Sequence, residues 1–250
     1  MFQLKLADTT NRKVLDKKGN ITIFEYDHDM SVEPGSAMSS YYASKMNVRR
    51  RQALFELNGS NSVIVQAGAM QWMAGAIEVA TNVKGVGDFA KKLISSKVTN
   101  ESAVKPCYKG NGLLMLEPTY KHLLIEDVGA WNGMVIDDGL FLACDANVEV
   151  KTVARTNLSS AIAGGEGLFN SCLVGKGYAV LESKVPREEL IEVELQDDVL
   201  KVDGSFAIAW SNSLSFTVER TTKTLIGSAA SGEGLVNVYR GTGKVLMAPL

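Results

Sequence analysis

Apolar residues recur at every second position in several stretches of the chain, which is the pattern of strands with one buried face. Residues 191–195 alternate between aliphatic residues and glutamate, so one face of this stretch is apolar and the other is charged. The same period of two occurs at residues 148–150 and 214–218. Many short strands separated by glycine-rich stretches are typical of sandwiches and barrels, so the chain is predicted to be all-β.

Three parts of the chain repeat the same short motifs in the same order, which indicates an internal repeat. Each copy begins with a glycine and an apolar run, continues to a glutamate, and ends in a Gly-x-Gly pair. The first glycines are Gly68, Gly139 and Gly204, the glutamates are Glu101, Glu166 and Glu233, and the pairs start at Gly110, Gly175 and Gly241. The spacing predicts repeats over residues 54–118, 120–183 and 188–250, with residues 1–53 packed on them in one compact body.

One stretch of the first repeat has helical spacing instead. Phe89 and Leu93 lie four residues apart, as do Ala90 and Ile94, so these side chains form one apolar stripe. A short helix is therefore predicted as an insertion in the first repeat.

The first 53 residues lie outside the repeat. Alternating apolar residues predict strands at 2–6 and 21–23, and the polar stretch 11–20 is predicted to be a turn. Residues 31–43, rich in Ser, Tyr and Met, are predicted to form a surface loop or an extended edge segment. The run of arginines at 49–51 is predicted to be a solvated edge, with contact to phosphate as the alternative.

The repeated motifs resemble those of the altered-inheritance-of-mitochondria family over residues 54–250. Residues 68–75 match Gly-x-Met-x-x-Met-x-Gly and residues 165–169 match Gly-Glu-Gly-Leu-Phe, whereas the first repeat departs with Asn-Glu-Ser at 100–102. The resemblance implies three β-sandwich-like repeats around a pseudo-threefold axis, in a fold similar to that of the tryptophan RNA-binding attenuation protein. It also implies assembly into a homo-oligomer, and it implies no enzymatic activity.

Composition places the chain among ordinary globular proteins, because 46% of its residues are hydrophobic and 22% are charged. The net charge of −2 supplies no overall attraction for nucleic acid, so nucleic acid is not expected as a partner, and any binding to an acidic surface has to be local. The longest apolar runs have about five residues, far short of the roughly 20 that a membrane span needs. Three widely spaced cysteines without a secretory signal favour a reducing cytoplasm over a disulfide framework or a zinc site.

The repeated glutamates Glu101, Glu166 and Glu233 are the candidate binding residues. Three carboxylates brought together by a threefold axis would repel one another unless a cation neutralised them, and the structural alternative is that each accepts hydrogen bonds from turn N–H groups. No catalytic residue, metal or cofactor is predicted. Strand-like sequence rather than a helix follows each Gly-x-Gly pair, which favours turns or bulges over phosphate binding.

Every repeated motif is therefore apolar strand or glycine turn, which is material for building a fold. We expect a non-enzymatic, cytoplasmic scaffold with a structural or interaction role. The alternative is a ring that binds RNA or a small, amino-acid-like molecule. A second alternative is a metal-dependent enzyme that uses the repeated glutamates.

Overall fold

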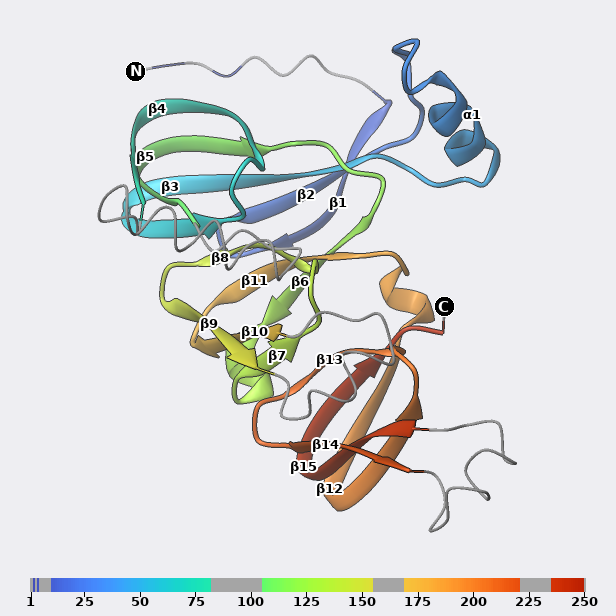
Figure 1. The fold of residues 1–250 in the computed structure, drawn as a ribbon. Helices are drawn as coiled ribbons and strands as arrows, with labels where there is room; N and C mark the ends of the chain where they lie inside the picture. Colours follow the sequence, from blue (N-terminus) through green and yellow to red (C-terminus); the bar gives the residue numbers. More distant parts are fainter. Residues whose placement is uncertain are drawn as a thin grey trace, which may run out of the picture.

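The computed structural model describes residues 2, 4, 10–81, 105–154, 169–220 and 235–249, and these are mostly β-strand (Figure 1). The strands are β1 (Arg12–Lys18), β2 (Ile21–Tyr26), β3 (Arg51–Val65), β4 (Met70–Ala80), β5 (Cys107–Leu116), β6 (His122–Asp127), β7 (Met134–Ile136), β8 (Phe141–Asp145), β9 (Val148–Ala154), β10 (Phe169–Gly175), β11 (Tyr178–Ser183), β12 (Ile191–Asp203), β13 (Ala207–Ser211), β14 (Ser215–Arg220) and β15 (Leu235–Met247). Helix α1 (Ala37–Lys45) and the 3-10 turns η1 (Val128–Trp131) and η2 (Arg187–Glu189) complete the described elements. The prediction of a β protein is confirmed.

The strands form two curled, antiparallel sheets. The first sheet has the order β1-β2-β3-β8-β11-β6, with β5 pairing to both β3 and β4. The second has the order β12-β15-β13-β7-β10-β9, with β14 also pairing to β15. Within the described ranges, no helix is long and apolar enough to span a membrane.

The same order of strands occurs in each predicted repeat. In the first, which we call module 1, β3 and β4 flank β5; in module 3, β12 lies on one side of β15 while β13 and β14 lie on the other. In module 2 each of the three strands is broken into two, so that β6 and β8 flank β11 in the first sheet, and β7 and β9 flank β10 in the second. Module 2 therefore belongs to both sheets and joins them.

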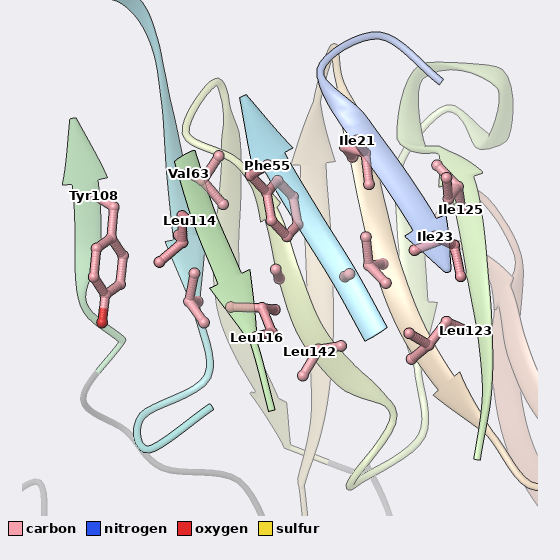
Figure 2. Close-up of a cluster of buried hydrophobic side chains, with 14 of the residues drawn as sticks. Ile21, Ile23, Phe55, Val63, Tyr108, Leu114, Leu116, Leu123, Ile125 and Leu142 are labelled. Carbon is pink, nitrogen blue, oxygen red and sulfur yellow. The ribbon is translucent and has the colours of Figure 1, made fainter. Parts of the chain in front are cut away.

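Three clusters of buried side chains hold the modules together. The first cluster lies beneath β2, β3 and β5 and extends to module 2 through Leu123, Ile125 and Leu142 (Figure 2). The second is centred on module 2, with Trp131 and Met134, and the third on module 3. The core is thus continuous along the chain, because each cluster contains residues from the neighbouring module.

Two predictions for the first 53 residues are wrong. Residues 12–18 form strand β1 rather than a turn, and Gly19, at φ +57°, makes the tight connection to β2. The charged residues of this stretch concealed a strand that lies at the sheet edge, where charges are well tolerated. The predicted loop at 31–43 contains the start of α1. The predicted helix at 89–94 lies outside the described residues, as does the predicted strand at 2–6 apart from Phe2 and Leu4.

The arginine run is also not a solvated edge. Arg51 is buried, and its Nη2 lies 2.7 Å from Oε2 of Glu25, while Arg50 pairs with Asp29. Isolated charges are expensive to bury, whereas an ion pair with good geometry offsets much of that cost. Two of the three guanidinium groups therefore serve to attach β3 to β2 and to the segment that follows β2.

The first two Gly-x-Gly pairs allow close approach of the backbones. Gly110 lies within β5 at φ +128°, and a Cβ there would lie 2.1 Å from the carbonyl oxygen of Ala76 in β4. At Gly175 the corresponding distance to the carbonyl oxygen of Asn147 is 2.3 Å. Strand residues rather than a helix follow each pair, as the sequence predicted.

Candidate functional site: the assembly edges

The predicted binding residues Glu101, Glu166 and Glu233 all lie outside the described residues, and their role stays a prediction. Within the described ranges, no group of three or more His, Cys, Asp or Glu side chains is arranged to hold a metal. The feature that recurs in the structure is instead a contact between backbones, and it joins one module to the next.

The first joint links modules 1 and 2, where the end of β3 pairs with β8. Ile64 lies opposite Cys144, and its neighbours Val63 and Val65 lie opposite Asp145 and Ala143. Two backbone hydrogen bonds close the ends of the joint: Gln66 N donates to Leu142 O at 2.8 Å, and Ala146 N donates to Ser62 O at 2.9 Å.

The second joint links modules 2 and 3 in the same way. Val135 of β7 lies opposite Trp210 of β13, with Met134 and Ile136 opposite Ser211 and Ala209. Here Asp137 N donates to Ile208 O at 2.9 Å, and Asn212 N donates to Gly133 O at 3.0 Å. Every pair and every hydrogen bond of the first joint therefore has a counterpart in the second.

The two joints have the same register when positions are counted from Gly68 in module 1, Gly139 in module 2 and Ser205 in module 3. One strand uses the third to fifth residues before this position, and the other uses the fourth to sixth residues after it. The backbone thus aligns Ser205, and not the predicted Gly204, with the other two. A one-residue shift of this kind would turn each side chain to the opposite face of the strand.

One of the two strands in each joint contains a β-bulge. Pairing shifts by one residue at Leu142 in β8 and at Ile208 in β13, and the carbonyls of these residues accept the hydrogen bonds described above. A bulge bends the strand and leaves one residue out of the ladder, which frees that carbonyl for the neighbouring module. Strand β4 has the same bulge at Gln71.

The side chains of each joint pack into two different buried clusters. Val63 and Val65 are buried in the first cluster, whereas Ile64 between them packs against the second. In the next joint Ile136 is buried in the second cluster and Val135 in the third. Because neighbouring strand residues point to opposite faces, a three-residue joint connects both cores.

Each joint pairs a strand that precedes the reference position with a strand that follows it, and one strand of each type is left without such a partner among the described strands. Strand β4 pairs with β5 on one side, and strand β12 pairs with β15 on one side; the other side of each pairs with no described strand. Figure 1 shows β4 and β12 at opposite ends of the molecule. Strand β4 carries Glu78 as its single charged residue among eleven, and Met73 is 41% exposed. A long, apolar edge strand is a template for pairing with another chain.

Comparisons with known proteins match most of the chain. The profile of the mitochondrial biogenesis AIM24 family matches residues 44–250. An uncharacterized protein of Streptococcus pyogenes serotype M6 is 26% identical over 202 residues, which is 78% of this chain and 79% of that protein. The crystal structure of protein SPYM3_0169 from Streptococcus pyogenes superposes with a TM-score of 0.58 at 25% identity, covering 81% of this chain and 89% of that one. These relatives indicate no specific function.

Proposed function

The chain belongs to the mitochondrial biogenesis AIM24 family, and we propose that it acts as a non-enzymatic scaffold whose copies assemble end to end through the free edges of β12 and β4. The observation that carries this proposal is the joint that occurs twice within the chain in one register. Adding a strand to an open sheet edge is a common mode of protein recognition, because the backbone groups of the edge supply the hydrogen bonds.

The register of the proposed contact follows from the internal joints. Counting from Ser205 and Gly68 gives three pairs, which are Leu200 with Ala74, Lys201 with Met73, and Val202 with Trp72. The closing hydrogen bonds would run from Asp203 N to Gln71 O and from Gly75 N to Val199 O. Gln71 is the bulged residue of β4, so its carbonyl has the position that accepts in both internal joints.

The side chains at these positions suit a contact between separately folded chains. Leu200 and Val202 already pack in the third cluster, as Val63 and Val65 pack in the first, while the exposed Lys201 takes the central position that Ile64 and Val135 occupy within the chain. A lysine stem covers apolar surface and keeps its ammonium group in water. A lysine on an open edge also discourages uncontrolled pairing before assembly.

We also propose that the three modules are copies of one unit, corresponding to residues 54–118, 120–183 and 188–250. The shared strand order, bulge and joint support this. A contact between different edges of identical chains closes into a ring or continues as a filament. The predicted pseudo-threefold axis would instead bring β12 and β4 of one chain together, but the two strands lie at opposite ends of the molecule (Figure 1), which favours a contact between chains. The likeness to the attenuation-protein fold stays a prediction, and the buried free thiols of Cys144 and Cys172 support a cytoplasmic location.

The test uses two variants with one introduced cysteine each, Ala74→Cys and Leu200→Cys, in a chain that also carries Cys107→Ser. Cys144 and Cys172 remain, because both are buried. Directly opposed residues of antiparallel strands have Cα atoms about 4.5–5.5 Å apart, which suits a disulfide. Mild oxidation of an equal mixture is expected to give a covalent dimer, whereas neither variant alone gives one.

The matched control replaces Ala74→Cys by Met73→Cys, which points to the opposite face of β4 and should not cross-link to Leu200→Cys. Native mass spectrometry of the unmodified protein from its own host gives the independent readout of assembly. Monomers that retain a stoichiometric small molecule or metal would refute the scaffold function. Oligomers without a cross-link in the mixture would refute the proposed edges but not the scaffold.

A further inference from the structure

The sequence contains three Asn-Gly dipeptides, at residues 58–59, 111–112 and 132–133. An asparagine before a glycine is chemically labile, because the backbone nitrogen of the next residue can attack the side-chain amide carbon and glycine has no side chain to hinder the approach. The attack needs an accessible backbone nitrogen and a chain that can leave the extended conformation. The fold therefore decides which of the three dipeptides is reactive.

Two of the dipeptides are held by the fold. Gly112 lies within β5 and is paired on both sides, opposite Leu57 of β3 and Gly75 of β4. Gly133 is buried, and its backbone N donates a hydrogen bond to Val128 O at 3.3 Å. In both places the glycine that would supply the attacking nitrogen is fixed by its surroundings, so attack has to wait for local unfolding.

The dipeptide at 58–59 lies where β3 is irregular. The pairing of β3 with β5 is interrupted after Asn58, so that residues 59–61 lie outside the ladder. Asn58 and Gly59 are both exposed, and Gly59 has φ +84°, outside the extended region. Water and hydroxide therefore have access to the Gly59 nitrogen, and the backbone around it is not held in a strand.

The side-chain oxygen of Asn58 is surrounded by hydrogen-bond donors. Asn58 Oδ1 accepts hydrogen bonds from Ser60 Oγ at 2.8 Å, from Ser60 N at 3.1 Å and from Asn61 N at 3.3 Å. This oxygen becomes negatively charged when a nucleophile adds to the amide carbon, and donors already aimed at such an oxygen stabilise the transition state. The three donors thus favour attack on the Asn58 amide.

We propose that Asn58 is a site of spontaneous modification, at which asparagine is converted to isoaspartate through a cyclic succinimide. The Gly59 nitrogen gives its proton to hydroxide and forms a bond to Cγ of Asn58. The bond from Cγ to Nδ2 breaks, and the side-chain nitrogen leaves as ammonia. Water then adds to the main-chain carbonyl carbon of residue 58 and breaks its bond to the Gly59 nitrogen, which leaves isoaspartate. Nothing is oxidised or reduced, because one water enters and one ammonia leaves.

The product places an extra carbon atom in the main chain and a carboxylate on its surface. The residues outside the ladder at 59–61 can absorb the extra length, whereas the same change at Asn111 would shift the register of β5 against both of its neighbours. An exposed isoaspartate is a substrate for carboxyl methylation, which is the class of reaction that would consume this product. The inference does not depend on the proposed assembly, because residues 58–61 belong to neither β4 nor β12.

The test is incubation of the full-length folded protein at mildly alkaline pH, followed by peptide mapping with mass spectrometry. The exchange of amide for carboxylate is followed at each Asn-Gly dipeptide, and electron-transfer fragmentation distinguishes isoaspartate from aspartate. We expect residue 58 to react at least about tenfold faster than residues 111 and 132 in the folded protein. In urea the three rates should become similar, because the protection of the other two is then lost.

Ser60→Ala removes one donor from Asn58 Oδ1 and should slow the reaction about two- to tenfold. The matched control is Ser62→Ala, since the Ser62 hydroxyl is not among the donors to Asn58, and its rate should equal that of the parent. Equal rates at the three dipeptides in the folded protein would overturn the proposal, as would aspartate formed without isoaspartate. A faster reaction in Ser60→Ala would also overturn it, because the donors would then protect the amide.

Discussion

Gly110 lies where β5 passes so close to β4 that a side chain has no room. A Cβ at this position would lie 2.1 Å from the carbonyl oxygen of Ala76, whereas ordinary contact begins at 3.4 Å, so Gly110→Ala forces the two strands apart. Overpacking costs about 1–3 kcal/mol. The residue also has φ +128°, which adds about 1–2 kcal/mol for a residue other than glycine. We expect a total loss of about 2–5 kcal/mol.

Gly68→Ala is the matched control, because Gly68 has φ +84° and no atom within 4 Å of the added Cβ. It should lose only the backbone contribution of about 1–2 kcal/mol. Urea unfolding followed by tryptophan fluorescence measures both variants, and a shift of the midpoint at constant slope reports the change in stability. If Gly110→Ala is no less stable than Gly68→Ala, close strand approach is not why glycine occupies this position.

Three further predictions concern buried groups. Arg51→Met leaves Glu25 buried without its main partner and should cost about 3–5 kcal/mol in urea unfolding, whereas adding Glu25→Gln should restore most of the loss; no recovery would contradict the pairing. Burial, assisted by nearby Arg51, lowers the pKa of His122 below its ordinary 6.5, so the unfolded chain takes up a proton more readily and stability falls as pH drops below 6.5. The urea midpoints at pH about 7.5 and about 5.5 should differ less in His122→Gln than in the parent. A thiol reagent should label Cys107 in the folded protein and all three cysteines after unfolding, because burial raises the pKa of the other two thiols; labelling of three in the folded state would contradict their burial.

Several strands and their grouping into three segments could be predicted from the sequence, whereas the contacts between the segments could not. Alternation predicted β12 and β14, and the repeated motifs predicted three segments that share one strand order. Strand β1 was missed because its charged residues conceal the alternation, and α1 was missed because its apolar residues face solvent rather than a core. Periodicity detects an element through its buried face, so an edge strand and a helix with exposed apolar residues both give weak signals.

The candidate site was beyond prediction from residue types. The bulged residues Gln71, Leu142 and Ile208 share no chemistry, because it is their backbone carbonyl that participates. The same holds for Ser205, which takes the place of a glycine in the other modules. The glutamates that the motifs singled out precede Gly110, Gly175 and Gly241 by 9, 9 and 8 residues in the sequence, whereas the joints recur through hydrogen-bonding groups that every residue possesses.

Module 2 contributes strands to both sheets, and this has a consequence for how such a gene can change in length. Dividing the gene within the part that encodes module 2 would remove paired strands from both sheets, so neither product would contain a complete sheet. Adding a module at either end would keep both sheets intact, because the open edge of β4 or β12 could pair with a strand of the added module. Longer arrays should therefore arise by terminal duplication, while the central unit persists as the shared corner of the whole body.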